Sequence, residues 1–183
     1  MASQNNLLGY IIVEGSESQV RGGALITDSK GFPLDFSRTE PLRPGQLDRI
    51  LYGASFEKHA KEEIILGSLL DSMELEPKLW ICNDRDILSA LRAKTKINVV
   101  LLEESPHTPL ETAGHIETTA EPGVFLIQVS MNGNPLRVEF PDNTRPDEVQ
   151  QIAEFLSEAS QSMNVLEPFT RLQKGLSFLA TGR

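Results

Sequence analysis

Residues 7–36 read LLGYIIVEGSESQVRGGALITDSKGFPLDF, and this stretch decides the fold. Residues 7–13 are nearly all apolar, which is typical of a strand buried on both faces. A second apolar run covers residues 24–27. After a turn that contains Asp and Gly, residues 32–36 place alternate apolar side chains on one face. The stretch predicts a central strand followed by a two-stranded hairpin, with Glu14 at the inner end of the first strand.

A glycine pair, Gly22-Gly23, opens the second run. Glycine inside a strand pattern admits a bulge or the close approach of another segment, whereas glycine between strands indicates a turn. A plain turn is the interpretation that we favour here.

The composition indicates one globular domain. The 183 residues are 39% hydrophobic and 23% charged, and the net charge of −9 disfavours non-specific binding to nucleic acid or acidic membranes. Cys82 is the single cysteine, so the chain has no intrachain disulfide and no cysteine-based zinc site. We see no signal peptide and no apolar run of the roughly 18 residues that a membrane span needs, which predicts a soluble cytoplasmic protein.

Residues 56–73 predict one amphipathic helix behind an N-cap at Ser55. Its apolar stripe includes Ile64, and both Glu62 and Glu63 lie beside this stripe. The spacing does not say which of the two carboxylates points inward. A short helix is also expected over residues 46–51.

A strand–helix–strand unit follows. Residues 78–82 and 97–102 are short apolar strands, and residues 85–94 between them show helical spacing. Such a crossover predicts parallel pairing. Asp84 then lies at the carboxyl end of a parallel strand, where the ligands of open α/β sheets gather.

The second half combines a polar segment, a hairpin and two helices. Residues 104–122 are expected to form a long flexible loop that contains His107 and His115, which we interpret as solvated. Asn-Gly predicts a hairpin between residues 123–130 and 136–140. Thr144 is the expected N-cap of the next helix, with Pro146 in its first turn.

We expect residues 1–160 to form a single α/β domain and residues 161–183 to form an amphipathic helical extension. Packing of this extension on its own domain is favoured over binding in a partner's groove. If there is a protein partner, we expect it to bind residues 104–122 or 168–179.

The order of these elements resembles the ribonuclease H-like fold, in which three antiparallel strands precede a helix and parallel strands. That family places acids on strand one, on the first core helix, after strand four and at a late helix. The matching residues are Glu14 in IIVEGS, Glu62 or Glu63 in AKEEII, Asp84 in LWICND and Asp147 in RPDEVQ. The pairing of IIVEGSES with RGGALI is the most family-like detail.

The resemblance implies a divalent-metal-dependent nuclease, or a nuclease-derived subunit that binds nucleic acid. Glu14, Glu62 and Asp84 would be ligands of Mg²⁺ or Mn²⁺, and Asp147 a further catalytic acid. Several carboxylates are needed to hold two such cations and activate water. The chain departs from the family at Glu14, where the family has Asp.

Each acid also has a structural interpretation that the sequence leaves open. Glu14 would be a charge at a strand end, Glu62 and Glu63 a solvated helix edge, Asp84 the cap of a helix, and Asp147 part of a capping box. In that case the chain is a non-catalytic interaction module or a subunit of a larger complex. A small α+β domain, longin- or roadblock-like, is the alternative fold.

The sequence gives little support for cysteine-based catalysis or for a nucleotide-binding loop. Cys82 lies inside an apolar strand and is expected to be a buried structural thiol. No glycine-rich phosphate loop occurs. Arg38 and Arg43 flank a proline-containing connector, and we interpret them as solubilising charges. Separately, residues 22–53 resemble a block in uncharacterised bacterial proteins, to which we attach no activity.

Overall fold

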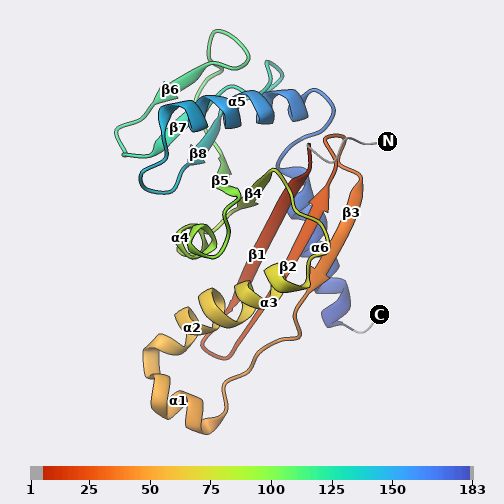
Figure 1. The fold of residues 1–183 in the computed structure, drawn as a ribbon, viewed down its shortest axis with the longest axis vertical. Coiled ribbons are helices and arrows are strands. Elements are labelled where there is room, and N and C mark those ends of the chain that lie inside the picture. Colours follow the sequence, from red (N-terminus) through yellow and green to blue (C-terminus); the bar gives the residue numbers. More distant parts are fainter. Residues whose placement is uncertain (1–5, 182–183) are drawn as a thin grey trace.

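The computed structural model describes residues 6–181, which form an eight-stranded mixed sheet with helices on both faces (Figure 1). The strands are β1 (Leu8–Ser16), β2 (Gln19–Thr27), β3 (Pro33–Arg38), β4 (Leu79–Cys82), β5 (Asn98–Glu104), β6 (Ile116–Thr118), β7 (Val124–Ile127) and β8 (Leu136–Glu139). The helices are α1 (Gln46–Tyr52), η1 (Gly53–Ser55), α2 (Phe56–His59), η2 (Ala60–Ile65), α3 (Leu66–Ser72), α4 (Arg85–Lys94), α5 (Pro146–Ser160) and α6 (Glu167–Ala180).

The strand order is β3-β2-β1-β4-β5-β8-β7-β6. The first three strands are antiparallel, and β1, β4 and β5 are parallel neighbours. This confirms the predicted ribonuclease H-like layout, in which a meander precedes a helix and parallel strands. The longin- or roadblock-like alternative is wrong, because the crossover over α4 joins parallel strands at the centre of a much wider sheet.

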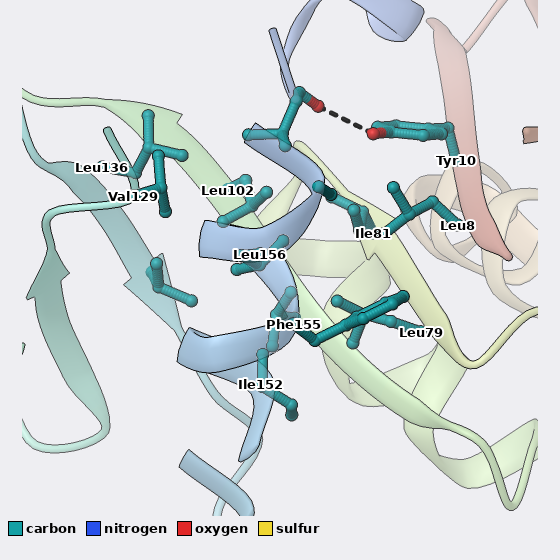
Figure 2. Packing of buried hydrophobic residues seen from close by; sticks show 14 of the residues in the cluster. Leu8, Tyr10, Leu79, Ile81, Leu102, Val129, Leu136, Ile152, Phe155 and Leu156 are labelled. Carbon is teal, nitrogen blue, oxygen red and sulfur yellow. Dashed lines mark hydrogen bonds between the residues drawn. The ribbon is translucent and has the colours of Figure 1, made fainter. Parts of the chain in front are cut away.

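Alternate side chains of the central strands enter two separate cores. Leu8, Tyr10 and Ile81 pack under α5 and α6 (Figure 2). Trp80 and Cys82, on the same strand as Ile81, pack under α2, η2, α3 and α4. The period of two along a strand therefore puts helices on both faces of one sheet, which explains why these strands read as continuous apolar runs.

The glycine pair lies within β2, so the plain-turn interpretation was wrong. A Cβ atom on Gly22 would lie 2.6 Å from Cγ2 of Ile65, and one on Gly23 would lie 3.0 Å from Cδ1 of Leu172. Gly22 therefore admits η2 on one face of the sheet, and Gly23 admits α6 on the other. Close approach of helices, not a turn, requires glycine at both positions.

The helix predicted over residues 56–73 is interrupted. Its middle, η2, is a π-helix, and Ser55 does not cap it, since the Ser55 hydroxyl donates to the carbonyl of Tyr52 (2.7 Å). A π turn adds a residue and shifts the helical phase. Ile64 is consequently 41% exposed, although uniform helical spacing places it on the buried stripe.

Two expectations for the second half also change. The segment 104–122 contains β6, which pairs with β7 and extends the sheet, so it is not a loop throughout. Thr144 is not the N-cap of α5, because its hydroxyl donates to the carbonyl of Pro141 (2.7 Å). Arg145 takes that position, and its backbone N–H donates to the Glu148 carboxylate (3.1 Å).

The final helix, α6, packs on its own domain, as the sequence favoured. Phe169, Leu172 and Leu176 are buried, and the first two belong to the core under α5. Because this stripe is covered by β1 and β2, it is not free to enter a partner's groove.

Candidate functional site

Glu14 lies at the end of β1, opposite Arg21 of β2. The Arg21 Nε donates to the Glu14 carboxylate (2.7 Å), and its Nη1 donates to the carbonyl of Leu176 in α6 (3.2 Å). Glu14 therefore faces α6, on the same side of the sheet as Ile12. Its carboxylate is held by an ion pair and not left at an open strand end.

Glu62 and Glu63 come from η2, which covers the opposite face of the sheet from α6. Glu63 accepts a hydrogen bond from Nζ of Lys94 in α4 (2.8 Å), and this bond is the main reason that its pKa is lowered. Glu62 lies 4.0 Å from Nζ of Lys58. The π-helix thus directs the two acids to different neighbours.

Asp84 and Asp147 both lie at helix starts. Asp84 is the N-cap of α4 and accepts from the backbone N–H of Asp86 (2.9 Å), as its structural interpretation proposed. Asp147 is exposed in the first turn of α5 and lies 3.4 Å from the Arg145 guanidinium.

The acids do not fit a two-metal site as they are placed. Glu14 faces α6, whereas Glu62 lies on the other side of the sheet, and each is beside a basic side chain. No group of three or more His, Cys, Asp or Glu side chains among residues 6–181 is arranged to hold a metal ion. A catalytic role for these residues stays a prediction from the resemblance, and the geometry does not add to it.

A pocket of about 460 Å³ does lie next to Glu62, between the α2–η2 helix and the start of α4. It is lined by Ala54, Glu57, Lys58, Lys61, Glu62, Arg85, Asp86 and Ser89. Three basic and three acidic side chains line it, so its formal charge balances although the chain carries −9.

The basic side chains of this pocket differ in how firmly they are held. Lys61 is largely buried and pairs with Glu57 (2.7 Å), whereas Lys58 is 74% exposed. Arg85 donates to Glu139 on β8 (3.0 Å), and this hydrogen bond is the main reason that the Arg85 pKa is raised. Lys58 is therefore the cation most available to an incoming anion.

Sequence reasoning singled out none of Lys58, Lys61, Arg85 and Asp86. The expected helix cap at Asp84 could have identified two of them. If Asp84 caps α4, then Arg85 and Asp86 occupy the first turn of α4, next to the carboxyl end of β4. Lys58 and Lys61 carried no signal, because the spacing of charged residues along a helix does not distinguish a pocket from an exposed helix edge.

Cys82 is buried, as predicted, and burial raises the pKa of its thiol to about 12. Another pocket, of about 480 Å³, lies between the end of β5, the β7–β8 connection and the segment that joins α5 to α6. Gln128 beside it is buried, and its side-chain amide donates to the carbonyl of Gly133 (2.8 Å).

Three solved structures of endonuclease V are similar to this fold. Endonuclease V from Bacillus subtilis matches with a TM-score of 0.64 and 10% identity, covering 97% of this chain and 84% of that chain. Endonuclease V from Streptomyces avermitilis matches with a TM-score of 0.57 and 14% identity, covering 84% and 72%. Endonuclease V from Ciona intestinalis, bound to a 23mer DNA containing an inosine, gives 0.51 and 10%, covering 82% and 76%.

At these identities the likeness shows the fold alone, which is ribonuclease H-like. No protein-family model matches the chain, and no curated protein matches it. Within residues 6–181, the helices are too short or too polar for any of them to cross a membrane.

Proposed function

We propose that this chain is a nuclease-derived subunit that binds nucleic acid without cleaving it. The observation that carries the proposal is the separation of the acids within a nuclease-like fold: Glu14 pairs with Arg21 on one side of the sheet, while Glu62 lies on the other. Hydrolysis of a phosphodiester by two divalent cations needs carboxylates that converge. Because the acids do not converge, we expect the fold to bind nucleic acid at its surface without hydrolysing it.

The pocket beside η2 supports nucleic acid as the ligand class. It lies at the carboxyl end of β4, the edge of an α/β sheet where ligands bind. Lys58 and Arg85 supply positive charge there, and Lys58 projects into solvent. The Ciona intestinalis neighbour was solved with DNA bound, which agrees with nucleic acid as the ligand.

Binding is expected to be weak and sensitive to salt. The overall charge repels a polyanion at long range, and only three basic side chains line the pocket, of which Lys61 is largely buried. Neutralising Z phosphates of single-stranded nucleic acid gives a slope of about −0.7Z in a plot of log K against log salt concentration. We therefore expect a slope of roughly −1 to −2.

Fluorescence anisotropy with labelled single- and double-stranded DNA and RNA tests binding, and gels of the same samples with EDTA, Mg²⁺ or Mn²⁺ test cleavage. We expect binding with no cleavage in any condition. Lys58→Glu should weaken binding at least about tenfold, since it replaces an attractive charge by a repulsive one. Lys30→Glu, an equal charge change on the exposed β2–β3 turn, is the matched control.

Two results overturn the proposal. If no nucleic acid binds, or if Lys58→Glu and Lys30→Glu bind equally well, the pocket is not the binding site. If Mg²⁺- or Mn²⁺-dependent cleavage occurs and is lost in Asp84→Asn, the acids are catalytic after all. Cleavage that survives Asp84→Asn points to a contaminating nuclease.

A second candidate function is a protein-interaction subunit. The observation that favours it is α1, which buries none of its residues although Leu47, Ile50 and Leu51 are apolar. Exposed apolar surface that is contiguous in this way marks interaction sites in many proteins. The segments that the sequence suggested for a partner, 104–122 and 168–179, do not include this helix.

A further inference from the structure

The pocket of about 480 Å³ lies on the face of the sheet that α5 and α6 cover, and we call it the Glu104 pocket. Its volume is within the range of pockets that hold small organic ligands. Its walls come from the end of β5, from the connection between β7 and β8, and from the segment that joins α5 to α6. It shares no lining residue with the pocket that contains Lys58.

Hydrogen bonds between segments hold the walls of the Glu104 pocket in place. The carboxamide of the buried residue Gln128 accepts from the backbone N–H of Leu110 (2.7 Å) and donates to the carbonyl of Gly133 (2.8 Å). The Asn134 side chain donates to the carbonyl of Ser105 (3.2 Å), which joins the β7–β8 connection to the end of β5. Because the chain makes these bonds by itself, the walls are formed before a ligand enters, and little ordering is needed on binding.

The floor of the pocket is apolar. Val129 and Leu136, labelled in Figure 2, are each 8% exposed and belong to the core under α5 and α6. Val165 belongs to the same core, and its carbonyl is held by the Tyr10 hydroxyl (2.8 Å). Met163 lines the pocket as well, and a thioether packs readily against an aromatic ring. The floor therefore suits a ligand with a flat apolar body.

Glu104 gives the pocket its charge. It lies on the same face as Leu102, two residues before it, and as Leu136, its partner on β8, so its carboxylate is on the side of α5 and α6. Among the described residues that line the pocket, it is the single one with a charged side chain. Within residues 6–181 it forms no ion pair, whereas Glu103, on the opposite face, pairs with Arg137 (3.0 Å). The rim therefore carries an unbalanced negative charge.

We propose that the Glu104 pocket binds a small arylalkylamine, with the ring on the apolar floor and the protonated amine donating to the Glu104 carboxylate. Serine and asparagine side chains complete the rim, and their oxygens can accept from the other N–H groups of the ammonium. Anions are disfavoured, since no basic side chain within residues 6–181 lines the pocket and the chain carries a net charge of −9. The ligand class is thus opposite in charge to the one proposed for the pocket beside η2.

This inference goes beyond the proposed binding of nucleic acid and does not depend on it. Glu104 and Lys58 line different pockets. Glu104→Gln should therefore leave the anisotropy titrations with nucleic acid unchanged, and Lys58→Glu should leave amine binding unchanged. Failure of one proposal is thus measured separately from failure of the other.

Isothermal titration calorimetry of the full chain with three indole probes tests the charge preference. Tryptamine, tryptophol and indole-3-acetate share the ring, and their short chains end in an ammonium, a hydroxyl and a carboxylate. We expect tryptamine to bind about tenfold more tightly than tryptophol, because its hydrogen bond to Glu104 is charge-assisted. Indole-3-acetate should show no measurable binding.

Glu104→Gln keeps the size of the side chain and removes its charge, so this variant should bind tryptamine no more tightly than tryptophol. Glu117→Gln is the matched control, an equal charge change at an exposed glutamate of β6. Its neighbour Ile116 packs against the core under α5 and α6, which places Glu117 on the other face of the sheet. The control should keep the wild-type preference for tryptamine.

Amide chemical shifts of the labelled chain locate the bound probe, and we expect the changes within residues 104–105, 129–136 and 160–166. Shift changes confined to other residues overturn the proposal, as does the absence of tryptamine binding at millimolar concentration. Equal affinity for tryptamine and tryptophol, or tryptamine binding that Glu104→Gln leaves unchanged, also overturns it. Adenosine that binds more tightly than tryptamine, and equally well to Glu104→Gln, would show instead that the pocket takes a neutral base.

Discussion

Tyr10 links the first strand to the connection between the last two helices. Its hydroxyl donates to the carbonyl of Val165 (2.8 Å), the hydrogen bond drawn as a dashed line in Figure 2. Its ring packs edge-on against Phe169 at 5.2 Å between centroids. Burial raises the pKa of this phenol far above its usual range. The side chain therefore stays neutral and keeps its proton for the hydrogen bond over the accessible pH range.

Tyr10→Phe should lower the free energy of unfolding by about 1–2 kcal/mol, because the Val165 carbonyl loses the hydroxyl that donates to it. Urea denaturation at pH 7 measures the change. Tyr52→Phe is the control, since Tyr52 is 39% exposed whereas Tyr10 is fully buried. Equal stability of Tyr10→Phe and the wild type would show that this bond contributes nothing.

Cys82 should be inert while the chain is folded. Burial raises its pKa from 9.0 to about 12, so the thiolate that reacts with alkylating reagents is scarce at pH 8. Since Cys82 is the single cysteine, labelling reports on this site alone. We expect iodoacetamide at pH 8 to modify the urea-unfolded chain and to leave the native chain unmodified.

The same shift predicts the pH dependence of stability. The folded-state pKa lies above the unfolded value, so the contribution of Cys82 is complete below about pH 9 and is lost as the pH rises toward 12. Cys82→Ala should remove that dependence, when urea midpoints are compared between pH 8 and pH 10. Rapid labelling of the native protein would contradict both expectations.

The direction of the Glu14 side chain could not be predicted from the sequence. Its place at the end of β1 was predictable, because the apolar run of the strand stops there. Its face was not, since it follows from the exact phase of the strand and from the cross-strand partner, Arg21. A metal site depends on that direction to within a fraction of a side-chain length.

At the level of elements, β2 is shaped by its two glycines. Gly22 lies under η2 and Gly23 under α6, on opposite faces of the strand. An added Cβ on Gly22 meets a side-chain methyl at 2.6 Å and the backbone carbonyl of Ile12 at 3.0 Å, whereas one on Gly23 meets only the ends of leucine side chains. Backbone yields less readily than a leucine rotamer, so the first position is the less tolerant.

Gly22→Ala should therefore lower the free energy of unfolding by about 1–3 kcal/mol, the usual cost of overpacking, and Gly23→Ala by less. Gly67→Ala is the opposite control: Gly67 lies in α3 with no atom within 4 Å of an added Cβ, so alanine should raise stability by about 0.5–1 kcal/mol. Thermal and urea unfolding of the three variants test this order. A tolerated Gly22→Ala would mean that η2 moves away at little cost.

The π-helix explains why the helix beside the pocket was harder to predict than the strands. Apolar spacing correctly placed Ile65, Leu66 and Leu69 toward the sheet. A π turn leaves no distinct pattern in so short a window, yet it changes the directions of the side chains within it. The directions of Glu62 and Glu63, and so the composition of the pocket, depend on this one irregularity.

Across the whole molecule, the sequence predicted the architecture better than the site. Apolar runs and one crossover were enough for the order of β1 to β5, because strand pairing follows from burial and connection length. The short strand β6 was missed, since three residues carry little periodicity. The pocket was missed because Lys58 and Arg85 come together only through the packing of η2, which follows α2, against α4.

One sheet with a core on each face predicts one cooperative unfolding transition. Trp80 and Ile81 are neighbours on β4 but belong to different cores, so neither core can lose its sheet wall without disturbing the other. Leu156→Ala in α5 and Leu69→Ala in α3 remove the same atoms from the two cores, and both leucines are fully buried. Each should lower the free energy of unfolding by about 2–5 kcal/mol.

Trp80 distinguishes cooperative unfolding from independent loss of the two cores, because it is the single tryptophan and lies in the core opposite Leu156. Its fluorescence in urea should shift to a lower midpoint in Leu156→Ala and coincide with the transition measured by circular dichroism. A tryptophan transition that keeps its wild-type midpoint while circular dichroism shifts would show two units. We expect one, because β1, β4 and β5 supply side chains to both cores and no segment separates them.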